Sequence, residues 1–412
     1  MIIVHISTAI TGGAGIATYR LHESLLQNIP DVESHVVQSQ PLRGNLLRNV
    51  HQCTHFHPLP YRIKKKCGLL PYCSDLERYQ KKIFSQPTNF DIISLPFSYY
   101  PIHRAPIVLD ADIIHLHWTC GFLDYKSFFQ NIKQPIVWTL HDIYPFMGLY
   151  HFKGDKNKNV NTELKQVDDK ILRYKQEAVR QKRDINIVCP SKWMYNQSVN
   201  SEMFNGYDHT VISNCFDIDS FIPKERNKAR QILGFNNSKK TIFFGADHIN
   251  LYGKGMDLLV SALKEIPKDS YNLVTVGRGD VADIGSNLTS NYKHFGFVQN
   301  LDLLNLIYSI ADFTIIPSRE DNLPSMMIES MLNGTPVISF TNGGMAEHIS
   351  TGTNGVLVEE MTADCLAKNI KDCLDDKYIF DAEMIRAYAV EQFNSQKIAN
   401  SYYDLYKSIL SR

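Results

Sequence analysis

Short runs of β-branched and aromatic residues alternate with longer amphipathic stretches along this chain. Eight such runs recur at intervals that leave room for helices between them: Ile2–Ser7, Ile113–Leu116, Ile136–Leu140, Ile185–Cys189, Thr241–Phe244, Leu273–Val276, Phe313–Ile316 and Val337–Phe340. Strands that alternate with helices in this way are typical of βαβ units, which build parallel sheets. The pattern therefore predicts an α/β fold.

The spacing of the runs also predicts two domains. A chain of 412 residues exceeds what one hydrophobic core usually supports. The strand series pauses in the segment SNCFDIDSFIP and restarts at Lys240. We expect a first domain over residues 1–219 and a second over 220–392. A helix over residues 393–412 carries one apolar face, which we expect to pack back on the first domain.

Two stretches interrupt the regular pattern. Residues 153–170 are polar and charged, which predicts a mobile loop or lid. Residues 51–82 combine Cys53 with His51, His55 and His57, but their spacing matches no standard zinc pattern, so we expect no metal there. The basic run Lys64–Lys66 is expected to form either a solvated face or a contact with anionic lipid headgroups.

Composition and charge narrow the class of protein. Hydrophobic residues make up 44% of the chain and charged residues 21%, as in soluble globular proteins. Forty-three basic side chains balance forty-three acidic ones, so the electrostatic footprint of a nucleic-acid-binding protein is absent. The sequence shows no signal peptide, and its eight cysteines form no disulfide framework. We therefore expect a cytoplasmic protein with reduced thiols, with peripheral membrane association left open.

Two strand-to-helix turns carry groups suited to phosphate. Gly12, Gly13 and Gly15 follow the first strand and precede a helix, whose N-terminal N–H groups favour anions. By itself such a turn is equally well explained as a tight connection. Lys254 follows the first strand of the second half, where its ammonium can stabilise a diphosphate leaving group.

The most informative segment is PSREDNLPSMMIESMLNGTPVISFTNGG, between two predicted strands. It places Asp321 in a loop and Glu329 eight residues later inside a helix. Both would face the crevice outside the carboxyl ends of the strands. Carboxylates accept hydrogen bonds from sugar hydroxyls, so one can orient a donor sugar and the other a ribose.

With these residues in place, the chain resembles a known family. The ordered motifs GG, NCFD, KGMDLL, VGRG, HFGFV, PSREDNLPSMMIESMLNGTPVI and NGGMAE are similar to those of family 4 of the retaining glycosyltransferases. The resemblance spans nearly the whole chain and is strongest between Lys240 and Val358. It implies the GT-B architecture, with two Rossmann-like domains facing a cleft, an acceptor site in the first and a nucleotide-sugar site in the second. The sequence is similar in particular to bacterial capsule, exopolysaccharide and O-antigen (lipopolysaccharide) transferases.

The resemblance also implies roles for individual residues. His141, Lys254 and Asp321 match positions next to the reacting sugar and diphosphate. Donor-binding positions are implied for a larger set: Gly12, Gly13, Lys254, Gly277, Phe297, Val298, Asp321, Asn322, Leu323, Pro324, Ser325, Met326 and Glu329. The sequence departs from the family pattern where Asp321 replaces a glutamate and Ala246 an arginine. His115 and His117 are interpreted as core residues or residues supporting His141.

The predicted function is transfer of a sugar from a UDP- or GDP-linked donor to a glycan or lipid-linked glycan. The implied mechanism is retaining and independent of a metal ion or other cofactor. Two alternatives stay open: a nucleotide-sugar epimerase of the same fold, which needs no acceptor, and a non-catalytic nucleotide-sugar-binding protein.

Overall fold

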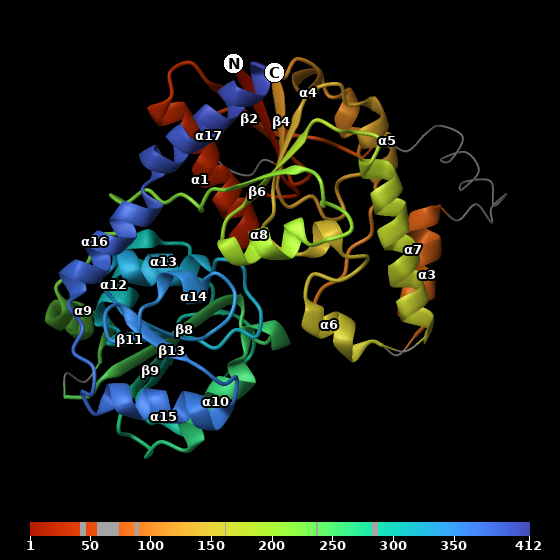
Figure 1. Ribbon diagram of the computed structural model, residues 1–412. Helices are drawn as coiled ribbons and strands as arrows, with labels where there is room; N and C mark the ends of the chain where they lie inside the picture. Colours follow the sequence, from red (N-terminus) through yellow and green to blue (C-terminus); the bar gives the residue numbers. More distant parts are fainter. Residues whose placement is uncertain (42–46, 56–73, 87–89, 161, 236–237, 282–286) are drawn as a thin grey trace. The chain divides into compact units, whose positions relative to one another are not determined.

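The computed structural model describes residues 1–41, 47–55, 74–86, 90–160, 162–235, 238–281 and 287–412. The chain forms two compact units (Figure 1). One contains residues 1–212 together with 398–412, and the other contains residues 213–397. Each unit is built around its own parallel sheet. No helix within the described ranges combines the length and the apolar character needed to cross a membrane.

The first unit has a seven-stranded sheet in the order β3-β2-β1-β4-β5-β6-β7, with every neighbouring pair parallel. Its strands are β1 Ile2–Ile6, β2 Glu33–Gln38, β3 Val50–Gln52, β4 Ile113–Leu116, β5 Ile136–Thr139, β6 Ile185–Cys189 and β7 Asp208–Val211. The strand order reverses between β1 and β4. In such sheets ligands bind outside the carboxyl ends of the strands at that point.

Helices connect these strands, as the sequence pattern predicts. They are α1 Gly12–Asn28, α3 Asp75–Phe84, α4 Pro106–Leu109, α5 Tyr125–Asn131, α6 Lys153–Lys158, α7 Thr162–Val179 and α8 Lys192–Val199, with short 3-10 turns at Ile102–Arg104 and Tyr144–Phe146. Side chains alternate between the two faces of a strand. Val4 and Ile6 of β1 therefore enter the core formed with α5 and α7, while His5 points to the opposite face.

The C-terminal helix α17, Ser395–Leu410, covers part of that opposite face. The Tyr406 hydroxyl lies 2.7 Å from Nδ1 of His115, on β4. The Tyr402 hydroxyl lies 3.0 Å from Oγ1 of Thr139, on β5. Both tyrosines are buried, so the packing of α17 on the first unit includes polar contacts inside the core as well as apolar ones.

The second unit has a six-stranded parallel sheet in the order β10-β9-β8-β11-β12-β13. Its strands are β8 Thr241–His248, β9 Asn272–Arg278, β10 Tyr292–His294, β11 Phe313–Ile316, β12 Val337–Phe340 and β13 Gly355–Val358. Counted along this unit, the order is 3-2-1-4-5-6, which is that of a Rossmann fold. It reverses between β8 and β11.

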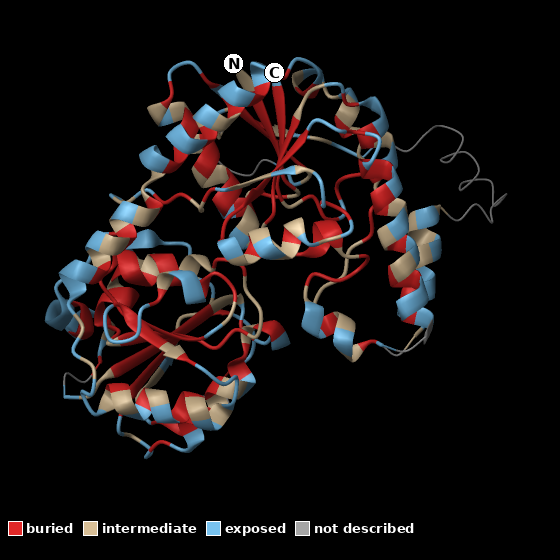
Figure 2. Ribbon diagram, viewed as in Figure 1, coloured by how far each residue is buried: buried red, intermediate tan, exposed pale blue. Residues whose placement is uncertain are grey.

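Helices cover both faces of this second sheet. They are α9 Arg226–Leu233, α10 Met256–Lys264, α12 Leu301–Ile310, α13 Ser325–Leu332, α14 Met345–His348, α15 Ala363–Leu374 and α16 Ala382–Phe393, with a 3-10 turn at Tyr252–Lys254. Ile242 and Phe244 of β8 pack with α10 and α15, whereas Phe243 between them packs with α9 and α12. The strands are consequently buried from both sides (Figure 2).

The predicted fold class is confirmed, and each of the eight predicted strands is present. The prediction of a loop or lid at residues 153–170 is wrong, because the described part of this segment forms α6 and the first half of α7. Leu164, Val167 and Ile171 recur at helical spacing and are buried against Leu149 and Tyr150. One thin apolar stripe is enough to fix a helix whose other faces are polar.

Candidate functional site

Lys254 and Asp321 meet at the switch point of the second sheet. Lys254 ends the turn that follows β8, and Asp321 lies in the loop that follows β11. The Lys254 ammonium is 2.6 Å from Oδ2 of Asp321. Their side chains are 29% and 15% exposed, so the ion pair is half-buried yet reachable from solvent. A cation and a carboxylate therefore occupy the position where this fold binds its ligand.

Close backbone contacts hold both loops in place. Gly255 has φ of 72°, and a Cβ atom there would lie 1.9 Å from the carbonyl oxygen of Pro317 at the end of β11. A Cβ at Gly343, after β12, would lie 1.8 Å from the carbonyl oxygen of Asp321. Only glycine permits these approaches. The loop that carries Asp321 is thus packed closely against Gly255 on one side and Gly343 on the other, which fixes the backbone position of Asp321.

Glu329 has a different partner from Asp321. It lies inside α13, and its Oε2 accepts a hydrogen bond of 3.0 Å from the hydroxyl of Tyr308 on α12. The Tyr308 ring is buried and packs edge-on against Phe243, with ring centroids 5.1 Å apart. A fixed phenol therefore orients Glu329, and the two carboxylates are held by separate groups.

The segment between the two carboxylates is tied down at its start. The amide of Gly344 donates to the carbonyl of Asn322 over 2.6 Å, and Asn322 and Leu323 are buried. Pro324, Ser325 and Met326 are partly exposed, and α13 begins at Ser325 with no side-chain cap from Pro324. The first turn of α13 therefore presents amides of the kind that bind anionic oxygens.

Gly277, Phe297 and Val298, three of the predicted donor-binding residues, lie next to each other. The amide of Gly277 donates to the carbonyl of Gly296 over 2.7 Å, which brings Phe297 and Val298 beside the end of β9. Phe297 is 37% exposed, and the guanidinium of Arg278 stacks on its ring at 3.6 Å from the centroid. Arg278 also pairs with Asp247.

In the first unit the predicted glycines lie inside the helix. Helix α1 begins at Gly12, so Gly12, Gly13 and Gly15 form its first turn instead of a loop before it. Thr11 precedes the helix and makes no side-chain cap hydrogen bond. Gly13 is exposed, and a Cβ atom there would have no neighbour within 4 Å among the described atoms. Its amide is thus placed at an open helix N-terminus.

His141 follows β5 and is linked to a second histidine. Its Nε2 lies 3.1 Å from Nδ1 of His117, which follows β4. Burial lowers the pKa of His141 to about 4, although the carboxylate of Asp142 opposes part of that shift. Burial and neighbouring imidazoles also lower the pKa of His117 well below its usual value. Both rings are therefore neutral at pH 7.

Asp142, next to His141, is the centre of a polar network. Its carboxylate accepts hydrogen bonds from the indole of Trp118 at 2.9 Å and from His151 Nδ1 at 2.7 Å, and His151 Nε2 lies 2.9 Å from Ser94 Oγ. Burial alone would raise the pKa of Asp142, but His151, Trp118 and the Tyr144 amide together lower it. Asp142 is thus a fixed, ionised anchor for the chain beside His141.

Sequence reasoning missed several of these residues. Tyr308, Trp118, Asp142, His151 and Ser94 stand in no motif that points to chemistry. His5 carried one signal: a histidine in an otherwise apolar strand, IIVHI. Its ring is fully buried and hydrogen-bonds His117.

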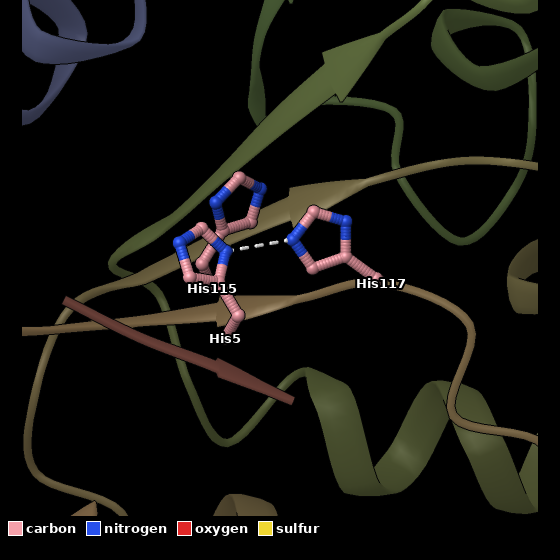
Figure 3. Close-up of side chains that lie close together, drawn as sticks. All are labelled: His5, His115 and His117. Carbon is pink, nitrogen blue, oxygen red and sulfur yellow. Dashed lines mark hydrogen bonds between the residues drawn. The ribbon is translucent and has the colours of Figure 1, made fainter. Parts of the chain in front are cut away.

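Within the ranges that the structure describes, a single group of side chains has ligand atoms near enough for a metal: His5, His115 and His117, within 4.8 Å of one another (Figure 3). Of the histidine and cysteine group named in the sequence analysis, His51 Nε2 lies 3.0 Å from His35 Nδ1, and His57 falls outside the described residues. The basic run Lys64–Lys66 also lies outside them.

Two parallel-sheet units of this topology, with the last helix packed on the first of them, define the GT-B fold of glycosyltransferases. Residues 238–376, which include Lys254, Asp321 and Glu329, match the family model described as Glycosyl transferases group 1. The match lies within the second unit.

Two curated proteins are similar to the chain in sequence. The chain is 29% identical over 195 residues to an uncharacterized glycosyltransferase of Methanocaldococcus jannaschii; the match covers 45% of this chain and 49% of that protein. It is 25% identical over 346 residues to an uncharacterized 41.2 kDa protein in the cps region of Klebsiella pneumoniae, covering 82% and 88% of the two chains.

Solved structures match the fold over the full length. The sucrose-phosphate synthase of Thermosynechococcus elongatus has a TM-score of 0.71 at 18% identity and covers 100% of this chain and 99% of its own. HepE of Anabaena, in complex with UDP-glucose, has a TM-score of 0.67 at 18% identity, with coverages of 99% and 100%. At these identities the likeness concerns the fold.

Proposed function

We propose that the protein is a retaining glycosyltransferase that moves a sugar from a nucleoside-diphosphate donor to a glycan or lipid-linked glycan. The observation that carries this proposal is the Lys254–Asp321 pair at the switch point of the second sheet, inside the segment that matches the family model. HepE of Anabaena, which has a similar fold, was solved in complex with UDP-glucose, and this supports a nucleotide sugar as the ligand.

The proposed chemistry assigns a task to each group. The bond between the sugar and the diphosphate breaks, and Lys254 with the amides at the start of α13 stabilises the charge that develops on the phosphates. Asp321 then accepts hydrogen bonds from the donor sugar, so the ion pair opens when the donor binds. Glu329, oriented by Tyr308, accepts from the ribose.

The acceptor hydroxyl attacks the same face of the sugar, and its proton passes to a donor phosphate oxygen. A covalent route through a carboxylate, as in retaining glycosidases, is not part of this proposal. The cation and the amides supply the electrostatic stabilisation, so no metal ion is assigned a task. We expect transfer to persist in EDTA; complete loss that magnesium or manganese restores would contradict a metal-independent mechanism.

The proposed setting is bacterial surface polysaccharide synthesis at the cytoplasmic face of the membrane. The Klebsiella relative encoded in a cps region supports the pathway. A lipid-linked acceptor would require contact with the membrane surface, to which we assign the basic run Lys64–Lys66. Flotation with anionic vesicles tests that contact, and equal binding after Lys64–Lys66 are changed to glutamine would refute it.

Calorimetric titration with UDP and GDP tests the donor site. We expect one nucleotide to bind, Glu329→Ala to weaken it by about 1–3 kcal/mol, and Glu383→Ala, an exposed change on α16, to leave it unchanged. Product analysis with the matching nucleotide sugar then separates three outcomes. Transfer to an acceptor supports the proposal, epimerised donor without acceptor supports an epimerase, and binding without turnover supports a binding protein.

A further inference from the structure

Three histidines form a continuous hydrogen-bonded chain from the predicted reaction site into the core of the first unit. Nε2 of His141 lies 3.1 Å from Nδ1 of His117, and Nε2 of His117 lies 2.9 Å from Nδ1 of His5. His141 is partly exposed, whereas the other two rings are buried. The chain therefore runs from an accessible end to an enclosed one.

The enclosed end is a dead end. Nε2 of His5 is buried and has no hydrogen-bond partner among the residues that the structure describes. Its neighbour across the sheet is His115, its Cα partner on β4. Both nitrogens of His115 are engaged elsewhere, with the Tyr406 hydroxyl at 2.7 Å and Thr139 Oγ1 at 2.8 Å. The chain thus stops at His5.

A metal ion is not the better explanation of this cluster. The rings of His5 and His115 are tilted by 38° to each other, with centroids 4.9 Å apart, and Nδ1 of His5 faces Nε2 of His117 (Figure 3). Nitrogens that bind one metal converge on it, but here five of the six ring nitrogens are paired with another histidine or with a hydroxyl group, and only Nε2 of His5 is unpaired among the described residues. The group also contains no carboxylate or thiolate that would neutralise a buried cation.

The number of N–H groups on the three rings decides in which direction the hydrogen bonds are donated. A neutral imidazole has one N–H donor and one acceptor nitrogen, so each ring must donate one way and accept the other. If every ring donates toward the core, His5 ends with an orphaned buried N–H. If every ring donates toward His141, His5 ends with an unused acceptor, which is the less costly defect.

We propose that the dead end at His5 holds His141 in its Nδ1–H tautomer, so that His141 donates a hydrogen bond to the reacting sugar or its acceptor. The part that concerns the sugar rests on the proposed glycosyltransferase function. His117 and His5 are positioning residues in this arrangement. His141 carries no lone pair on Nδ1, so it does not take the acceptor's proton, which passes to the donor phosphate instead.

NMR of the protein with nitrogen-labelled histidine reads the tautomers directly, and two other histidines serve as internal standards. Nδ1 of His209 faces the carbonyl of Tyr207 at 2.8 Å, so His209 is an Nδ1–H tautomer. Nε2 of His22 faces the carbonyl of Arg48 at 3.0 Å, so His22 is an Nε2–H tautomer. We expect His141, His117 and His5 to match His209; a match of His141 to His22 overturns the proposal.

His117→Phe adds a functional test, with His209→Phe as the matched control in the same unit. We expect the His141 tautomer to become mixed and kcat to fall by roughly 10- to 100-fold, the scale for a misplaced group at the reacting centre. Affinity for the nucleotide is expected to stay unchanged, because the second unit holds it. An unaltered His141 spectrum and rate would refute a positioning role.

The two proposals fail separately. The wild-type spectrum needs neither a variant nor enzyme activity, so it tests the tautomer even if His117→Phe does not fold. An Nδ1–H His141 in a protein that transfers no sugar would overturn the proposed function alone. Transfer by a protein whose His141 is the Nε2–H tautomer would overturn the inference alone.

Discussion

Removing the Tyr308 hydroxyl isolates the step by which one helix orients the carboxylate of another. Tyr308→Phe keeps the ring that packs edge-on against Phe243, and removes the hydroxyl that donates the 3.0 Å hydrogen bond to Glu329. We expect weaker binding of the donor nucleotide, because Glu329 would then have to be ordered when the ribose arrives.

The magnitude follows from that ordering. Immobilising one flexible side chain costs about 0.5–1.5 kcal/mol on binding. Since about 1.4 kcal/mol is a tenfold change, the dissociation constant should rise by about 2- to 12-fold. The full value of a hydrogen bond to a charged group, about 1.5–3 kcal/mol, is an upper limit, because the partly exposed carboxylate of Glu329 recruits water in the variant.

A double-mutant cycle by calorimetry tests this reasoning. In a Glu329→Ala background the change Tyr308→Phe should alter nucleotide affinity by less than about 0.3 kcal/mol, because there is no carboxylate left to orient. Equal effects of Tyr308→Phe in both backgrounds would refute the coupling. Unchanged affinity in the single variant would show that the ribose does not contact Glu329.

Other predictions test charge and burial. Lys254→Met should lower kcat by about 10²–10³-fold, whereas Lys264→Met, an exposed change on α10, should not; equal rates would remove Lys254 from leaving-group stabilisation. Burial lowers the pKa of His22 to about 4, so between about pH 4 and 6.5 the unfolded state binds more protons than the folded state. The free energy of unfolding should therefore fall as the pH drops from 6.5 toward 4. The fall should be less steep in His22→Gln. Burial lowers the pKa of Lys175 to about 7, so urea denaturation should show stability rising between pH 7 and about 10, a rise that Lys175→Met should flatten.

Most strands of the two sheets could be predicted from the sequence, because buried parallel strands consist of continuous apolar runs. Phe313–Ile316 and Val337–Phe340 are such runs, and both strands have exactly these limits in the structure. Some of the strands that escaped prediction are polar or short, as in Asp208–Val211 at the edge of the first sheet, but Gly355–Val358 is apolar and as long as these two. The polar helices at 153–170 escaped because a thin apolar stripe carries little signal beside so many charges.

Some contacts of the candidate site could be predicted from the sequence and others could not. Lys254 and Asp321 follow strands that are neighbours at the switch point, so their approach to each other could be anticipated from topology alone. The bond between Tyr308 and Glu329 could not, because it depends on how α12 and α13 pack against each other. The unpaired nitrogen of His5 could not be anticipated either, because it depends on the register between β1 and β4.

The first unit draws its last helix from the far end of the chain, and this affects the order of folding during translation. Residues 398–412 leave the ribosome only after the whole second unit has been made. Until then, His115 and Thr139 lack the Tyr406 and Tyr402 hydroxyl groups that they contact in the finished core. The second unit can therefore be complete while the first still lacks its last helix.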